Sequence, residues 1–134
     1  MIINGVNLGE LGTREIDIYG CVDFASFFAQ LQMKFPQFEI DYHQTNNLNE
    51  IVNLLLSNKN ADGIILNPGG YTHTSIIIAD AIKSIDTKVI EVHISNIFAR
   101  EQYRKNSFIA SACSGSIAGF GLRGYELAIN FFSD

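Results

Sequence analysis

The feature that most constrains the fold is a regular alternation of short apolar runs with segments whose apolar residues recur at helical spacing. The run from Gly63 to Leu66 is continuously apolar, which is typical of a strand buried on both faces. A helical spacing is shown by Phe24, Phe27, Phe28, Leu31 and Phe35. Because parallel strands need long crossover connections, this alternation predicts a parallel α/β sheet covered by helices on both faces.

The same patterns predict the order of the elements. Strands are expected at residues 1–4, 38–43, 63–66, 88–92 and 113–120. Helices are expected after an Asp23 cap, from Leu48 to the Asn58 break, from Ser75 to about Ile82, and over 122–132. The sheet order 2-1-3-4-5 is assumed for these strands. The chain has 134 residues and shows no linker or repeat, so one domain is expected.

Composition excludes several classes of protein. The formal net charge is -5 and the basic residues are scattered, so no nucleic-acid partner is expected. The longest aliphatic run, Ile76 to Ile78, is too short to cross a membrane, and the first residues do not resemble a signal peptide. Cys21 and Cys113 form no disulfide framework or metal-ligand pair, so a cytoplasmic protein with reduced thiols is expected.

Polar residues gather in three loops that follow predicted strands. These loops span residues 4–20, 67–75 and 93–96. In an open parallel sheet, ligands bind beyond the carboxyl ends of the strands, where the strand order reverses. With order 2-1-3-4-5, strands one, three and four are neighbours, so the three loops are expected to meet in one cleft.

Four segments in these regions resemble the type II 3-dehydroquinate dehydratases, in the same order and at matching separations. They are INGVNLGELGTREIDIYG, ILNPGGYTHTS, IEVHISNIFARE and GFGLRGYELA. The resemblance covers nearly the whole chain. It implies a flavodoxin-like subunit, a dodecamer built as a tetramer of trimers, and no cofactor. The implied reaction is the trans elimination of water from 3-dehydroquinate to 3-dehydroshikimate, in the shikimate or quinate pathway.

Dehydration next to a carbonyl needs a base, a group that stabilises the enolate, and an acid. Tyr19 is the predicted base, and Arg14 on the same loop is the cation that would favour its phenolate form. The resemblance implies the same pair, whereas spacing alone leaves Tyr19 equally well explained as a packed loop residue. The predicted acid is His93, and Glu91, two residues earlier on the same strand face, would orient it.

Further residues are assigned by the resemblance. Asn7 matches a residue that stabilises the enolate through a bound water. Substrate contacts are implied for Asn67, His73 and Arg104, and backbone amides that hold the substrate carboxylate for Ile94 and Ser95. Asp80 matches a residue that reaches the site from a neighbouring subunit. Taken alone, Asn67 would be a turn residue, and Asp80 and Arg104 would be solvated charges.

Other interpretations are weaker. The G-x-G-x-x-G run from Gly119 to Gly124 suggests dinucleotide binding, but the chain ends before the expected acidic ribose ligand, so tight packing between strand and helix is predicted instead. The three histidines lack metal-ligand spacing, and no lysine lies in the site loops for Schiff-base chemistry. The remaining alternative is a catalytically inactive binding module with the same fold, kept open by departures such as Val6 and Phe98.

Overall fold

A computed structural model of the chain describes residues 1–6, 8–10 and 23–134, and its centre is a five-stranded parallel sheet. The sheet has the order β2-β1-β3-β4-β5, which confirms the order assumed from the sequence. Its strands are β1 (Ile2–Asn4), β2 (Tyr42–Gln44), β3 (Ile64–Asn67), β4 (Val89–His93) and β5 (Gly115–Ala118). This topology is flavodoxin-like.

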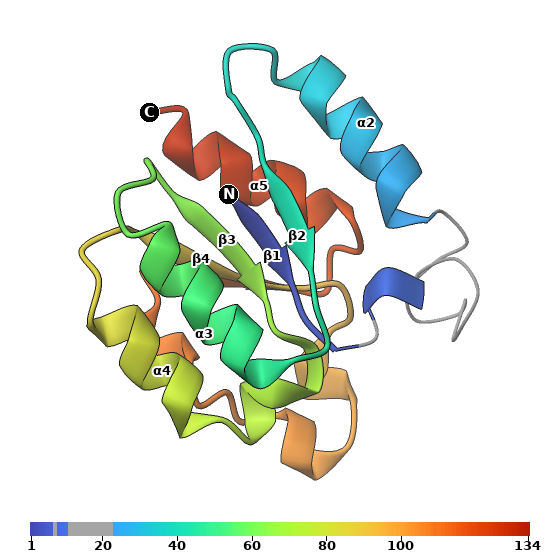
Figure 1. Ribbon diagram of the computed structural model, residues 1–134. Coiled ribbons are helices and arrows are strands. Elements are labelled where there is room, and N and C mark those ends of the chain that lie inside the picture. Colours follow the sequence, from blue (N-terminus) through green and yellow to red (C-terminus); the bar gives the residue numbers. More distant parts are fainter. Residues whose placement is uncertain (7, 11–22) are drawn as a thin grey trace.

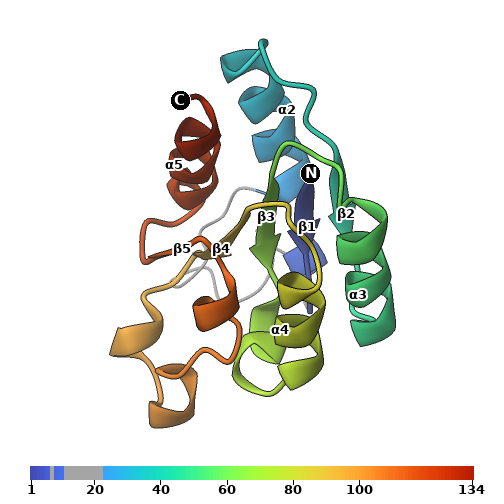
Figure 2. The same ribbon diagram turned by 90° about the vertical axis from the view of Figure 1, so that its left-hand side faces the viewer.

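In the described part of the chain, four α-helices cover the sheet in two layers (Figures 1 and 2). They are α2 (Phe24–Lys34), α3 (Leu48–Ser57), α4 (Ile76–Lys83) and α5 (Arg123–Phe132). Short 3-10 helices are η1 (Leu8–Glu10), η2 (Gly69–His73), η3 (Ile97–Ala99), η4 (Gln102–Arg104) and η5 (Ala110–Ala112). Helices α2 and α5 lie on one face of the sheet, and α3 and α4 lie on the other (Figure 2).

The two layers enclose two apolar cores, one on each face of the sheet. Successive residues of a strand point to opposite faces, so Ile2 packs with α2 and α5 whereas Ile3 packs with α3 and α4. Every residue of β3 and β4 is buried. Burial on both faces explains why these strands are apolar runs, and it makes Asn67, Glu91 and His93 stand out as buried polar residues.

Side-chain caps begin three of the helices. Asp23 accepts a hydrogen bond from the backbone amide of Ser26, and Ser75 accepts one from that of Ile78, as the sequence predicted. Asn47 does the same for Glu50 at the start of α3. Each cap satisfies an amide that has no partner within its helix.

The second strand is shorter than predicted. The alternating pattern predicted a strand over 38–43, but the structure has β2 at Tyr42–Gln44. The difference arises because β1 is only Ile2–Asn4, and Ile2 is paired with Tyr42. Residues before Tyr42 therefore have no strand opposite them, although Ile40 is still buried in the core. The fifth strand is shorter as well, at Gly115–Ala118.

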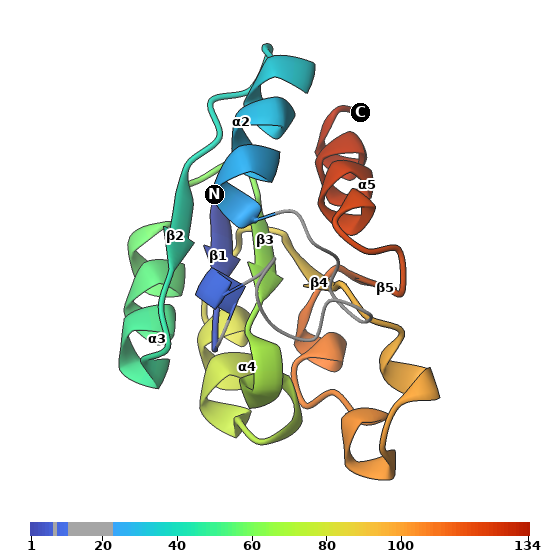
Figure 3. The same cartoon turned by 90° about the vertical axis from the view of Figure 1, so that its right-hand side faces the viewer.

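The carboxyl ends of the strands share one end of the molecule, and the connection from β4 to β5 extends from that end (Figure 3). Both chain termini lie at the opposite end. In the connection from β5 to α5, Gly119 and Gly121 have positive φ values of 91° and 59°. A Cβ on Gly124 would lie 3.2 Å from Val92 Cγ1, so the glycine-rich segment from Gly119 to Gly124 allows α5 to pack tightly against the strands, as predicted.

Among the described helices, none is long and apolar enough to cross a membrane.

Candidate active site

The centre of the candidate site is a buried acid–base pair on β4. Glu91 and His93 are two residues apart on one strand, so their side chains lie on the same face. His93 Nε2 lies 2.6 Å from Glu91 Oε1, and the side chains are only 7% and 1% exposed, respectively. The structure therefore brings together the predicted acid and the residue predicted to orient it.

Two serines from the following segments complete the surroundings of Glu91. Ser107 Oγ donates to Glu91 Oε1 at 2.6 Å, and Ser116 Oγ donates to Oε2 at 2.6 Å. Burial acts to raise the pKa of Glu91, but the hydrogen bond and charge of His93 and the two serine bonds outweigh it, so this pKa lies below its ordinary value. Glu91 is therefore a carboxylate at neutral pH despite its burial.

His73 brings a second imidazole to the same place from η2. Its ring stacks near that of His93, with centroids 6.3 Å apart and planes inclined by 27°. His73 Nδ1 lies 2.7 Å from the backbone oxygen of Asn106, which fixes the ring. The predicted convergence of the loops after β3 and β4 is thus confirmed for these two histidines.

Asn67, the last residue of β3, is buried and its amide is held within the fold. Its Nδ2 donates to the hydroxyl of Tyr125 at 3.0 Å, and its Oδ1 accepts from the amide of Gly69 at 3.2 Å. Tyr125 in turn donates to Oδ1 of Asn4 at 2.7 Å. Asn67 therefore shapes the turn after β3, and its contact with substrate stays a prediction.

The residues after β4 have partners of their own. The backbone oxygen of buried Ile94 accepts from the amide of Gly121 at 3.0 Å, and Ser95 Oγ accepts from Arg100 Nη1 at 3.4 Å. Arg104 on η4 pairs with Glu101 at 3.0 Å between Nε and Oε2. Arg104 therefore has an exposed carboxylate partner in the single chain.

Four predicted residues are not placed at this centre by the structure. Asp80 lies on the exposed surface of α4, and its predicted contact with a neighbouring subunit stays a prediction. Asn7, Arg14 and Tyr19 lie outside the described residues, so their predicted roles stay predictions.

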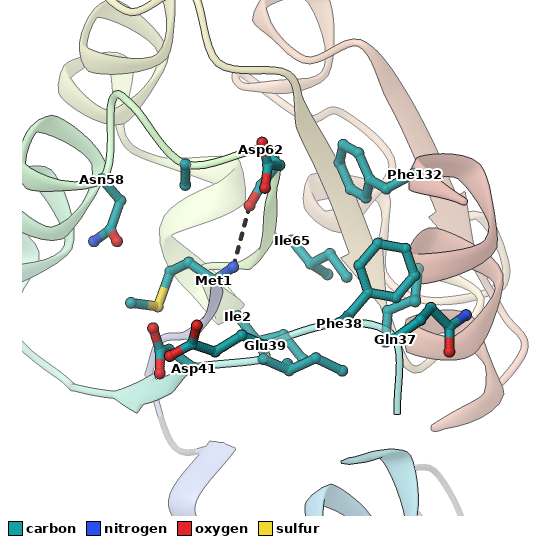
Figure 4. A pocket seen from close by; sticks show the side chains of 14 residues that line it. Met1, Ile2, Gln37, Phe38, Glu39, Asp41, Asn58, Asp62, Ile65 and Phe132 are labelled. Carbon is teal, nitrogen blue, oxygen red and sulfur yellow. Dashed lines mark hydrogen bonds between the residues drawn. The ribbon is translucent and has the colours of Figure 1, made fainter. Parts of the chain in front are cut away.

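A cavity of about 420 Å³ adjoins the Glu91–His93 pair. Its walls include Ser107, Ser116 and Lys105, together with apolar side chains such as that of Phe98. A second cavity, of about 360 Å³, is lined by Met1 and Phe132 among others, and there the amino group of Met1 donates to the oxygen of Gly63 at 3.1 Å (Figure 4). Because it lies at the amino ends of β1 and β3, this second cavity is remote from the chemistry at His93.

Residues 1–6, 8–10 and 23–134 contain no group of three or more His, Cys, Asp or Glu side chains that could hold a metal ion. Cys113 is a free thiol near Glu91. Burial, followed by the negative charge of Glu91, raises the pKa of this thiol to about 12, so the thiolate form that acts as a nucleophile is scarce at neutral pH.

Sequence reasoning missed three polar residues at this site: Ser107, Ser116 and Tyr125. No local pattern distinguishes the serines, which lie 16 and 25 residues from Glu91 in the chain. Tyr125 lies on the apolar face of α5 and is fully buried. A buried tyrosine usually needs a hydrogen-bond partner, which was the one available signal.

The parallel sheet and the buried acid–base pair at its carboxyl end define an α/β protein equipped for proton transfer. The sequence pattern of class II dehydroquinases matches residues 1–133, and the chain belongs to this family. A 3-dehydroquinate dehydratase of Caldicellulosiruptor saccharolyticus is 45% identical, over 96% of this chain and 92% of its own.

Solved structures agree with this membership. The type II dehydroquinase of Butyrivibrio crossotus superposes with a TM-score of 0.95 at 38% identity, covering 99% of this chain and 95% of its own. That of Propionibacterium acnes has a TM-score of 0.94 at 36% identity, covering 99% and 94%. The family predicted from the sequence motifs is confirmed.

Proposed function

We propose that this protein is a lyase that eliminates water from 3-dehydroquinate to give 3-dehydroshikimate, the reaction of the shikimate pathway. The observation that carries the proposal is the Glu91–His93 pair, with 2.6 Å between Oε1 and Nε2, at the carboxyl end of a class II dehydroquinase sheet. An imidazole held by a carboxylate is a common proton carrier in general acid–base catalysis.

The elimination proceeds through an enolate. A base removes the proton from the carbon next to the ketone, and the electrons of that C–H bond move into the enolate. The enolate then collapses, the carbon–carbon double bond forms, and the C–O bond of the leaving hydroxyl breaks. His93 gives its proton to that hydroxyl, which departs as water. The Glu91 carboxylate, with Oε1 2.6 Å from Nε2, holds the ring that carries this proton.

The residues for the first step come from the family resemblance. Tyr19 is the proposed base, and Arg14 is the cation that favours its phenolate. Asn7 would hold the water that stabilises the enolate. For the substrate itself, we assign polar contacts to Asn67, His73 and Arg104 and carboxylate binding to the backbone amides of Ile94 and Ser95, since backbone amides and guanidinium groups bind anions well.

We also propose that the protein works as a homo-oligomer, a dodecamer by the family resemblance, with Asp80 completing the site of a neighbouring copy. Asp80 lies four residues after Ile76 on α4 and therefore shares its helix face. Ile76 and its neighbour Ile77 are 63% and 56% exposed, and Phe98 and Phe120 are similarly exposed elsewhere. An apolar surface of this kind is typical of contacts between proteins.

The first experiment follows the absorbance of the conjugated product after 3-dehydroquinate is added to purified protein without any cofactor. We expect steady product formation, and His93→Gln should lower kcat by about 10²-fold or more. The matched control is His43→Gln, because His43 lies on β2, away from His93, and pairs with the exposed Glu50. Tyr19→Phe tests the proposed base.

A folded wild-type protein that leaves 3-dehydroquinate unchanged would overturn the lyase and favour the inactive binding module. Full activity in His93→Gln would remove His93 from the acid role. The oligomer is tested by light scattering, with about twelve times the 14.9 kDa of one chain expected. Asp80→Ala should then lower kcat while the assembly stays intact.

We also propose that the protein is located in the cytoplasm, where the thiol of Cys113 stays reduced.

A further inference from the structure

The hydroxyl group of Ser107 has its single proton committed to Glu91. Ser107 Oγ accepts from the backbone amides of Ile109 at 3.3 Å and Ala110 at 3.1 Å. These two bonds occupy the two acceptor positions of a hydroxyl oxygen. The remaining short contact, of 2.6 Å to Glu91 Oε1, must therefore be a bond that Ser107 donates.

Ser116 approaches the other carboxylate oxygen from the neighbouring strand. In the pairing of β4 with β5, Ser116 is the direct partner of Glu91. Its Oγ lies 2.6 Å from Glu91 Oε2. The two serines thus reach the same carboxylate from separate segments, and each binds a different oxygen.

These bonds decide which nitrogen of His93 carries a proton. An ionised carboxylate can only accept hydrogen bonds, and Glu91 is kept ionised by its donors. The contact of 2.6 Å between Glu91 Oε1 and His93 Nε2 is therefore an Nε2–H donation, whether the imidazole is neutral or charged. Within the described part of the chain, no residue forms a hydrogen bond with Nδ1 of His93.

We propose that Ser107 and Ser116 are positioning residues of the dehydration. They hold the Glu91 carboxylate in place, and Glu91 accepts from Nε2–H of His93 in both charge states of the ring. In the imidazolium the second proton is on Nδ1, which transfers it to the leaving hydroxyl and leaves the neutral Nε2–H form. This assignment rests on the proposed role of His93 as the acid. It adds the atom that reacts and two residues, far apart in sequence, that select it.

The titratable groups around this centre set the expected pH dependence. Among the described residues, Glu91 contacts His93 on the same strand, and Cys113, just before β5, lies near Glu91. His73 faces His93 from η2, and Lys105 lines the cavity beside the pair. A hydrogen bond to the charged form lowers a carboxyl pKa. Removal of a serine donor should therefore raise the pH at which Glu91 is protonated, and the acid limb of the kcat profile should move up with it.

Ser116 gives the cleaner test, because the described bond of its hydroxyl is to Glu91 alone, whereas Ser107 also binds two backbone amides. We would compare Ser116→Ala with Ser116→Thr, which keeps the hydroxyl. The matched control is Ser114→Ala, which removes a serine hydroxyl just before the start of β5. Two readouts are needed: the pH profile of kcat, and the imidazole ¹⁵N spectrum of His93. The chain has only 3 His, so His93→Gln assigns the signal.

We expect neutral His93 in the wild type to give the spectrum of the Nε2–H form. Ser116→Ala should lower kcat about tenfold and move the acid limb up by about one pH unit, while Ser116→Thr and Ser114→Ala stay near the wild type. A wild-type spectrum of the Nδ1–H form, or an unshifted acid limb in Ser116→Ala, would overturn the proposal. Either result can occur in a fully active enzyme, so it is distinct from a failure of the lyase function itself.

Discussion

The hydroxyl of Tyr125 on α5 donates a hydrogen bond of 2.7 Å to Oδ1 of Asn4 at the end of β1. The same hydroxyl accepts one of 3.0 Å from Nδ2 of Asn67 at the end of β3. All three side chains are buried. The last helix is thereby joined to the two central strands at the level where the site begins. Burial raises the pKa of the Tyr125 phenol, so this hydroxyl stays neutral and structural.

We predict that Tyr125→Phe destabilises the protein by about 1–3 kcal/mol, because Oδ1 of Asn4 and Nδ2 of Asn67 each lose the hydrogen bond to the buried hydroxyl. The free energy of unfolding from urea titrations measures this change. Tyr103→Phe is the matched control, since Tyr103 is 66% exposed on η4. Equal stability of both variants would show that the buried bonds contribute nothing.

Glu91→Gln should change how stability depends on pH. The pKa of Glu91 in the folded protein lies below its ordinary value of 4.5. The carboxylate therefore contributes stability that is fully present above pH 4.5 and is lost as the pH falls through the lowered folded value. We expect the stability of the wild type against urea to fall more steeply than that of Glu91→Gln as the pH decreases below 4.5. Parallel curves would contradict the assigned direction.

The same substitution tests the support that Glu91 gives to His93. A Gln amide has a single acceptor oxygen, and its NH₂ group can only donate, so it removes the charge of the carboxylate together with at least one of its three accepted hydrogen bonds. The imidazolium of His93 then loses its counter-ion. We expect kcat at neutral pH to fall about tenfold or more. Near-native kcat in a folded variant would mean that the charge of Glu91 is not needed.

Cys113 should be unreactive in the folded protein. Its pKa of about 12 leaves almost no thiolate at neutral pH, and only the thiolate reacts readily with alkylating agents. We expect iodoacetamide to modify Cys113 in urea but not under native conditions, with peptide mass spectrometry distinguishing it from Cys21. Rapid native labelling of Cys113 would contradict the burial of this thiol.

Gly5→Ala should be destabilising because there is no room for a methyl group beside the β3 turn. A Cβ on Gly5 would lie 2.5 Å from the backbone oxygen of Pro68, and backbone cannot move aside cheaply. We expect a loss of about 1–3 kcal/mol in the free energy of unfolding. Gly70→Ala is the control, since a Cβ at Gly70 would have no described residue within 4 Å other than its chain neighbours. Similar stabilities would show that the loops adjust.

The sequence alone determined the alternation of strands and helices, two of the helix caps, and the family. These features are local, because periodicity and capping depend on residues a few positions apart. The placement of His93 and Glu91 on one strand face was predictable for the same reason. The sequence pattern overestimated the second strand, because a strand ends where its neighbour ends, and only the pairing of Ile2 with Tyr42 reveals that.

Tertiary structure alone decided which polar groups meet. Ser116 reaches Glu91 through the register of β4 and β5, and Tyr125 reaches Asn4 across 121 residues of chain through the packing of α5. A hydrogen bond forms only when two atoms approach within about 3 Å, and no local pattern fixes a distance between remote segments. The chain's motifs therefore specify the reaction class, whereas the packed sheet and helices select the atoms that take part.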